Sequence, residues 1–407
     1  MNTGKTKKRN WEDTIIALLL LVMVFLFGHA YSHGDTTLAD EKMRTILAYF
    51  VISISIISYL LCFSFKRIEL TAFIIPPIIY FLISSFNVAV GVASGVTLFI
   101  RTFLIFIVKP SIRSKVLKWY RYLLIAMSIL SLTALLAYYF GFNNLYRIVP
   151  FYESEGEYLD FAFSFIYRRG NTLRLCGLFN EPGYFGTICA FILCYEKMNL
   201  KKVGNLVLLF AGILTFSLAF IIIVLAYLII ISVRKPSTII LMIAAIVVWF
   251  VVIPRIDFEN DNVNHIIERL TFSNGGLLGD NRSNIYVDTE LKKMIEQNPV
   301  WGFGGGYSSD AFYNVSTYKT FLIDYGCLGF SLMYGSLLLI VIAKYRFNLY
   351  SLGFIVCFFL SVYQRPHIFN ILFALVLLGS LDSLAGYRKK TNPISSRKNA
   401  KNAYAFY

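Results

Sequence analysis

Charged residues are scarce in this chain, and their scarcity excludes an ordinary water-soluble protein. Only 15% of the 407 residues are charged, whereas 57% are hydrophobic, which is more apolar surface than a single core in water can hide. Apolar runs of about 16 to 24 residues recur along nearly the whole chain, and about 20 residues of helix cross a membrane. Because a backbone in lipid must satisfy its own hydrogen bonds, we predict that these runs are helices.

Cysteine pairs and acidic residues are also few. The six cysteines form no Cys-x-x-Cys pair, so nothing in the sequence indicates a zinc site or a disulfide framework. The 23 acidic residues are outnumbered by 38 Lys and Arg, which gives a formal net charge of +15. Such an excess can mark a nucleic-acid-binding protein, but here the basic clusters fall in short segments between apolar runs. That distribution follows the positive-inside rule of membrane proteins, and we expect no nucleic-acid partner.

The order of apolar and basic segments predicts an all-α polytopic membrane protein with about 12 transmembrane helices. The expected spans cover residues 14–31, 45–65, 70–87, 88–108, 122–140, 180–195, 203–216, 218–233, 237–253, 320–343, 347–363 and 368–385. Basic residues follow every even-numbered span, so both termini are expected in the cytoplasm. Residues 203–233 form one long apolar run, either a single tilted helix or two short spans that turn near "LTFSLAF". We favour the hairpin because it agrees with the basic C-terminus.

We expect residues 1–407 to form one integral membrane domain with two large loops on the outer face. The loops cover residues 141–179 and 254–319, and loops of this length are usually functional or disordered. The second loop is expected to be partly helical at "RSNIYVDTELKKMIEQNP" and to form a compact turn at "WGFGGGY".

Arginine dominates the basic residues of the outer face. Arginine presents a planar fork that binds phosphate oxygens with two hydrogen bonds, and it is less strongly hydrated than lysine. We therefore expect a site for an anionic group carried by a lipid, although any single arginine can equally be a solvated loop charge. The arginines in question are Arg147, Arg168, Arg169, Arg174, Arg255, Arg269, Arg282 and Arg365.

The stretch "RLCGLFNEPGYFG" places Arg174, Glu181 and Pro182 at the entrance of an expected span. Ionisable groups at membrane depth are costly unless they are used. Proline favours the first position of a helix, so we expect a helix to start at Pro182 with Glu181 at its positive end. The plainer interpretation, a carboxylate that only caps the helix, stays open.

This segment resembles the Arg-x-x-Gly-x-Phe-x-Glu-Pro segment of the Wzy-type O-antigen polymerases, relatives of the O-antigen ligases. The similarity continues through "LTFSLAF", "IIERL", "GDNRSNIYVDTELKKMIEQNPVWGFGGGY" and "TFLIDYGCLGF". The family pattern there is an Arg-led helix, a Pro-x-x-Gly-x-Gly turn and a span with Gly-x-x-Gly. The resemblance covers roughly residues 170 to 335, and the order and spacing of the motifs carry it.

The resemblance implies a glycosyltransferase of the bacterial inner membrane that takes part in surface-polysaccharide or lipopolysaccharide biosynthesis. It would polymerise undecaprenyl-pyrophosphate-linked oligosaccharide repeat units, which serve as both donor and acceptor, on the periplasmic face. Other expected partners are membrane lipids and a chain-length regulator protein. Neither a cofactor nor a metal is expected.

The chemistry of such a reaction assigns roles to particular residues. Charge develops on the departing pyrophosphate, where preorganised arginines stabilise it, and we expect Arg174 and Arg282 to do so. A carboxylate can accept the proton of the attacking hydroxyl; Glu181 is the first candidate and Asp324 the second. Asp324 can also be a plain helix N-terminal charge. Substrate contacts are expected from Arg168, Arg169, Arg269, Tyr184, His265, Tyr307 and Arg365.

Two departures favour a polymerase over a ligase. Ligases carry a His-Asn shortly before the span expected at 320–343, where this chain reads "YNVSTYKTFL". They also tend to have Ser-Arg at the turn where this chain has Ser217 and Leu218. A lipid-linked oligosaccharide transporter is the alternative of another class, but carriers show inverted repeats and none is visible. Residues 257–268 have the acidic spacing of a calcium loop, yet Asn262 replaces its required glycine.

Overall fold

The computed structural model describes residues 3–28, 41–69, 72–85, 92–150, 156–233, 240, 272–273, 276–277, 285–308, 317–363, 365–366 and 369–387. A helix lies at each expected span within these residues, while the span expected at 237–253 lies almost wholly outside them. The helices are α1 Thr3–Gly28, α2 Glu41–Ser64, α3 Ile75–Ser85, α4 Val92–Ile107, α5 Pro110–Tyr139, α6 Pro182–Tyr195, α7 Val203–Ile213, α8 Leu218–Ile231, α11 Ile285–Gln297, α13 Tyr318–Lys344, α14 Leu349–Val362 and α15 Ile371–Leu384, with short 3-10 turns at Ala72–Ile74 and Asn143–Leu145.

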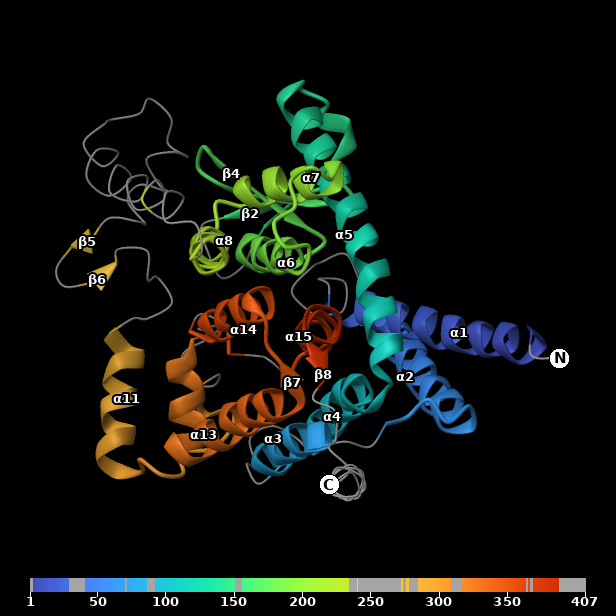
Figure 1. The fold of residues 1–407 in the computed structure, drawn as a ribbon. Coiled ribbons are helices and arrows are strands. Elements are labelled where there is room, and N and C mark those ends of the chain that lie inside the picture. Colours follow the sequence, from blue (N-terminus) through green and yellow to red (C-terminus); the bar gives the residue numbers. More distant parts are fainter. Residues whose placement is uncertain are drawn as a thin grey trace, which may run out of the picture.

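Two of the described helices, α5 and α13, are long and apolar enough to cross a membrane. Several others are apolar but shorter, among them α6, α7, α8, α14 and α15. The chain is therefore mostly helical and has the helix lengths and composition of a membrane-associated protein. Figure 1 looks nearly along the axes of α6 and α8, with α14 and α15 beside them and the α1–α2 pair projecting from one side.

The centre of the bundle is α6, which packs against α7, α8 and α14. Its side chains from Phe185 to Cys194 are almost completely buried, as expected for a helix that is apolar all round. Helix α15 packs against α4 and α5 and closes the opposite side. Aromatic rings join these layers: Phe191 lies within 6.1 Å of Phe354, Phe358 and Phe373, measured between ring centroids.

Residues 203–233 form two helices that fold back on each other, which confirms the expected hairpin. The N-terminal end of α7 lies near the end of α6, where Lys202 pairs with Glu196. The C-terminal end of α7 and the turn after it lie beside the start of α6. A Cβ added to Gly186 of α6 would lie 2.6 Å from Thr215 Oγ1 and 2.9 Å from Ser217 Cβ, two residues of that turn. Helix α8 then runs parallel to α6 and packs along it. Ser217 caps α8 by accepting a hydrogen bond from the Phe220 amide.

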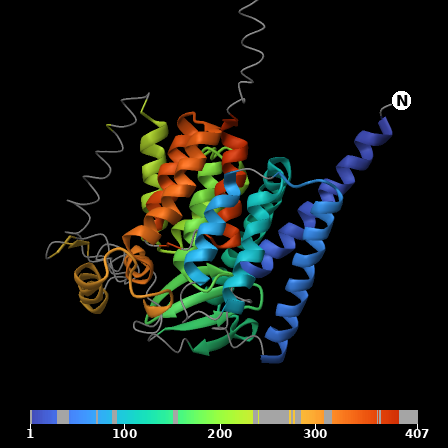
Figure 2. The same ribbon diagram turned by 90° about the horizontal axis from the view of Figure 1, so that it is seen from below.

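The expectation of an all-α fold is wrong for the first outer loop. Four strands between Arg147 and Gly177 form an antiparallel sheet in the order β1-β2-β3-β4, at one end of the helix bundle (Figure 2). Buried apolar side chains stabilise the strands, among them Leu159, Phe165, Ile166, Leu175 and Cys176, and neighbouring residues are buried together in β3 and β4. The strands are β1 Arg147–Pro150, β2 Glu157–Asp160, β3 Phe165–Arg169 and β4 Thr172–Gly177. Short two-stranded pairs lie elsewhere, at β5 Phe272–Ser273 with β6 Gly276–Leu277 and at β7 Tyr345–Arg346 with β8 Gly386–Tyr387.

The second outer loop contains the helix that the sequence predicts, α11, which packs against α13. After α11 the Gly-rich turn docks on a break in α13 at Gly326, where φ is 64° and ψ is −179°. The break leaves backbone groups of α13 without partners inside the helix, and residues 299–304 form hydrogen bonds with these groups. The hydrogen bonds run from the Phe303 amide to the Ile323 carbonyl (2.8 Å), Gly304 to Asp324 (2.9 Å), Cys327 to Pro299 (2.9 Å) and Leu328 to Val300 (3.1 Å).

This docking predicts that Gly326→Ala destabilises the protein. A Cβ at this position would lie 2.2 Å from the Val300 carbonyl oxygen, and backbone angles of this kind cost a non-glycine residue about 1–3 kcal/mol before any clash is counted. Gly335 lies on the same helix with nothing within 4 Å of an added Cβ, so Gly335→Ala is the matched control. Thermal unfolding in detergent should show a lower midpoint for Gly326→Ala only; equal midpoints would contradict the docking.

Candidate functional site

The helix α6 begins at Pro182, as predicted, and Glu181 is its N-cap residue with extended backbone. The Glu181 carbonyl oxygen accepts hydrogen bonds from the amides of Tyr184 and Phe185. Its side chain makes no capping hydrogen bond; it instead accepts a hydrogen bond from Arg365 Nη2 at 2.6 Å. The Glu181 side chain therefore does not cap the helix; it forms an ion pair with Arg365 instead.

The Glu181–Arg365 pair joins residues 184 positions apart in the sequence. The side chain of Arg365 is 11% exposed and that of Glu181 is 39% exposed. The guanidinium thus lies inside the protein while the carboxylate keeps an open side. A carboxylate with an open side and a fixed cation next to it can meet a polar substrate and an anion at the same place.

Tyr184 forms the apolar wall of this pair. Arg365 Cζ lies 5.2 Å from the centroid of the Tyr184 ring, a cation–π contact, and Phe373 stacks on the same ring at 5.5 Å. The Tyr184 hydroxyl is buried and has no hydrogen-bond partner among the described residues. Buried hydroxyl groups normally have a partner, so this atom offers an unused donor beside the ion pair.

Arg174 lies on β4 and points toward the turn between α7 and α8. Its Nε donates to the Thr215 carbonyl oxygen at 2.9 Å and its Nη2 to the Phe216 carbonyl oxygen at 3.2 Å. These two donors hold backbone, so Arg174 fastens the turn in this structure. Its expected contact with pyrophosphate stays a prediction.

Of the other expected arginines of the first loop, Arg147 lies on β1 and pairs with Asp160 at 2.6 Å, while Arg168 and Arg169 lie on β3. Arg168 pairs across the sheet with Glu157, and its Nη1 lies 3.4 Å from the Tyr138 hydroxyl. Those hydrogen bonds raise the pKa of Arg168 above its ordinary value. Arg169 is the last residue of β3 and is exposed. The described contacts of Arg168 are structural ones, within the sheet and to α5.

Asp324, the second candidate base, holds the Gly-rich turn. It accepts hydrogen bonds from the Ser308 amide at 2.8 Å, the Ser308 hydroxyl at 3.0 Å and the Gly306 amide at 3.3 Å. Asp324 therefore has a structural role, but not that of a helix N-terminal charge, because it is the seventh residue of α13. Tyr307 is also engaged, since its hydroxyl donates to Glu290 on α11 at 2.8 Å. That hydrogen bond raises the pKa of the Tyr307 phenol.

Three expected site residues, His265, Arg269 and Arg282, lie outside the described residues, as does the calcium-like segment 257–268. Among the residues that the structure describes, no group of three or more His, Cys, Asp or Glu side chains could hold a metal ion. The structure therefore brings together Glu181, Arg365 and Tyr184 from the expected set.

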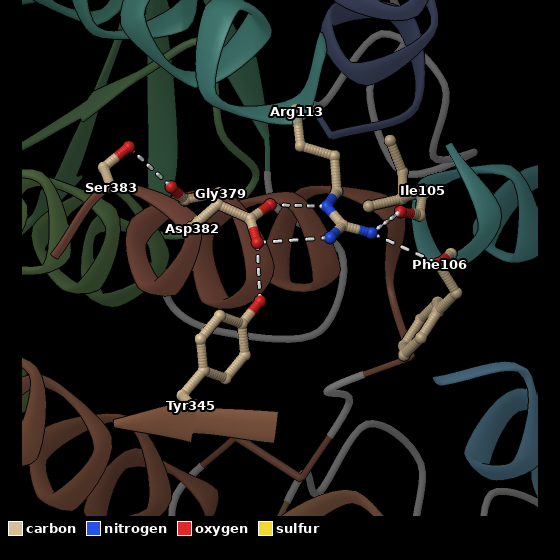
Figure 3. A network of polar contacts seen from close by, with 7 residues as sticks. All are labelled: Ile105, Phe106, Arg113, Tyr345, Gly379, Asp382 and Ser383. Carbon is tan, nitrogen blue, oxygen red and sulfur yellow. Dashed lines mark hydrogen bonds and ion pairs between the residues drawn. The ribbon is translucent and has the colours of Figure 1, made fainter. Parts of the chain in front are cut away.

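Sequence reasoning missed one polar group of the interior. Asp382 lies in the apolar helix α15, where an ionisable side chain is itself an indication of a special environment. It pairs at 2.7 Å with Arg113, which follows the fourth expected span. Figure 3 shows this network, which lies near the end of α15.

Comparison with known proteins adds no relative: no family model, no curated protein and no solved structure matches this chain.

Proposed function

We propose that the protein is a glycosyltransferase of the bacterial inner membrane that polymerises undecaprenyl-pyrophosphate-linked oligosaccharide units on the periplasmic side. The observation that supports this most is the Glu181–Arg365 pair at the start of α6. Sequence motifs select Glu181, and the fold supplies a cation beside it from the far end of the chain. The proposal places about twelve helices in the membrane with both termini in the cytoplasm; basic residues near one end of the bundle, among them Arg67, Lys109 and Lys202, support it.

The reaction divides between the two members of the pair. A hydroxyl of the acceptor sugar attacks the anomeric carbon of the donor, and its proton passes to the Glu181 carboxylate. A new glycosidic bond forms while the bond from the anomeric carbon to the pyrophosphate oxygen breaks. The electron pair stays on that oxygen, and Arg365 stabilises the developing negative charge. The unpartnered Tyr184 hydroxyl is placed to donate to the same leaving group.

The experiment that tests the function uses purified protein in detergent or liposomes with defined lipid-linked repeat units. A ladder of longer lipid-linked glycans is the expected product, together with free undecaprenyl pyrophosphate in equal amount to the bonds formed. Transfer to a lipid A-type acceptor without a ladder would show a ligase instead. Movement of the lipid across the bilayer without a new bond would show a transporter.

We expect this polymerisation to continue after divalent metals are removed. The proposed charge stabilisation comes from a guanidinium, which needs no metal to hold phosphate oxygens. The measurement is the rate of ladder formation before and after treatment with EDTA and gel filtration. A loss of activity that one added divalent ion restores would overturn this prediction and direct attention to residues 257–268.

A further inference from the structure

The helices around the Glu181–Arg365 pair are too short to cross a membrane. Helices α6, α8, α14 and α15 have 14 residues each, and α7 has 11. At 1.5 Å per residue these lengths are about 21 Å and about 17 Å, whereas the hydrocarbon layer is roughly 30 Å thick. If one end of each helix lies at a membrane surface, the other end lies inside the hydrocarbon.

The ends of these short helices that are farther from the Glu181–Arg365 pair lie close to charged residues. Glu196, just after α6, pairs with Arg121 at 3.1 Å and also with Lys202, just before α7. Near the end of α15, Asp382 pairs with Arg113. Such clusters belong at the membrane surface rather than at its centre.

Helix α2 provides a full-length reference. It ends close to the same charged level, because the Arg67 carbonyl that follows it accepts a hydrogen bond from the Lys109 amide at 3.0 Å. It has 24 residues, about 36 Å. Figure 2 shows α2 running past the ends of the short helices as far as the sheet. The sheet thus lies at the level of the end of α2 that is farther from the charged residues.

In the turn between α7 and α8, the backbone carbonyl groups have protein partners, as a turn inside lipid requires. Its carbonyl groups are bonded by protein: Leu214 by the Leu175 amide at 3.0 Å, and Thr215 and Phe216 by Arg174. A turn in water would not need these partners, because water would supply them, but each unbonded group in hydrocarbon costs several kcal/mol.

The connection between α14 and α15 follows the same pattern at its described residues. The Tyr363 carbonyl accepts from the Tyr318 amide at 3.3 Å. The Phe369 carbonyl accepts from Thr102 Oγ1 at 2.6 Å, and that of Pro366 from the Tyr334 hydroxyl. This second connection is independent of the first and carries Arg365 itself.

We propose that the Glu181–Arg365 site lies within the hydrocarbon depth, about 10 Å below the outer boundary of that layer. The α7–α8 turn and the α14–α15 connection form its floor, and Arg174 is a positioning residue that holds the floor in place. This depth favours one class of ligand, an anionic headgroup carried on a lipid; that consequence rests on the proposed function. A free anion from water would have to leave its hydration shell to reach the site.

The depth can be measured without any assay of activity. Nitroxide labels on single introduced cysteines, in full-length protein in liposomes with the native cysteines replaced, report depth through the ratio of collisions with oxygen and with a water-soluble nickel chelate. On α2 the exposed residues Phe63, Ile56 and Tyr49 serve as a ruler. They lie about 6, 17 and 27 Å from Arg67 along the helix. On α7 the reporter is Ile213, which is 47% exposed beside the turn.

We expect a label at Ile213 to match Ile56, near the bilayer centre, and a label at Val203 to match Phe63 near the inner surface. A label at Ile213 that is as shallow as one at Tyr49 would overturn the proposal while leaving the proposed reaction intact. Phe210, 58% exposed on the same face, gives the same comparison if the Ile213 variant does not fold. Conversely, a deep label in a protein that makes no polymer would keep the depth and reject the reaction.

Discussion

Glu181→Gln should slow polymerisation by about 10²–10⁴-fold, the usual contribution of a general base, while the protein stays folded. Glutamine keeps the shape of the side chain and an acceptor oxygen for Arg365, but it cannot take the proton of the attacking hydroxyl. The rate of ladder formation with purified protein is the measurement. Glu12→Gln is the matched control, because Glu12 is also paired with an arginine, Arg67, and is far from the site in the sequence.

A double variant separates catalysis from support. If Glu181 only neutralises Arg365, Glu181→Gln lowers the unfolding midpoint by leaving a buried cation alone, and Glu181→Gln with Arg365→Gln should recover that midpoint. If Glu181 is the base, Glu181→Gln loses activity while its unfolding midpoint stays near that of the wild type. Arg365→Lys should also fail, since lysine keeps the charge but loses the planar group that covers Tyr184. Normal ladders from Glu181→Gln would assign this stretch to the scaffold.

The helices could be predicted from the sequence because each is specified locally. Apolar composition predicts where the spans lie. Pro182 and the basic residues that follow the spans predict where helices begin and end. The hairpin at residues 203–233 followed from charge alone. The sheet at residues 147–177 was missed although its pattern is present. Apolar residues are concentrated in "EYLDFAFSFIYRRGNTLRL" and alternate with polar ones at "TLRL", and the Arg-Gly-Asn turn with Gly170 at φ 56° is a hairpin indication.

The site could be predicted only in part, because its members meet through the fold. Glu181 and Arg365 were each selected, but nothing local says that they form a pair. Arg174 was selected for its charge, and its contact with the carbonyls of Thr215 and Phe216 depends on where α7 ends. Asp324 shows the same limit: its sequence position fits a base or a helix charge, and only the fold shows that it holds the Gly-rich turn.

The second large effect is expected near the end of α15, in the network around Asp382 (Figure 3). Asp382 accepts hydrogen bonds from Arg113 Nε at 2.7 Å and Nη2 at 3.2 Å and from the Tyr345 hydroxyl at 2.6 Å. The two charged side chains are 2% and 1% exposed. Arg113 Nη1 also donates to the carbonyls of Ile105 and Phe106 at the end of α4. One arginine therefore joins α4, α5 and α15.

Asp382→Ala should lower the free energy of unfolding by about 3–5 kcal/mol, the cost of removing one partner from a buried ion pair. The loss comes mainly from the guanidinium left without a counter-charge, since alanine itself suits a helix. Tyr345→Phe removes a single hydrogen bond to a charged group and should cost about 1.5–3 kcal/mol. Ser383→Ala is the neighbouring control: Ser383 is exposed and its hydroxyl donates to the Gly379 carbonyl, so a change within about 0.5 kcal/mol is expected.

A double variant tests the explanation rather than the size of the effect. Arg113→Met with Asp382→Leu removes both charges, so it should be more stable than Asp382→Ala although it contains more changes. Recovery should be partial, because the carbonyls of Ile105 and Phe106 lose their donor and the Tyr345 hydroxyl loses its acceptor. Apparent unfolding temperatures in detergent, read from intrinsic fluorescence, rank the variants. If the double variant is the least stable of them, packing around α15 holds this end of the bundle and the charge pair does not.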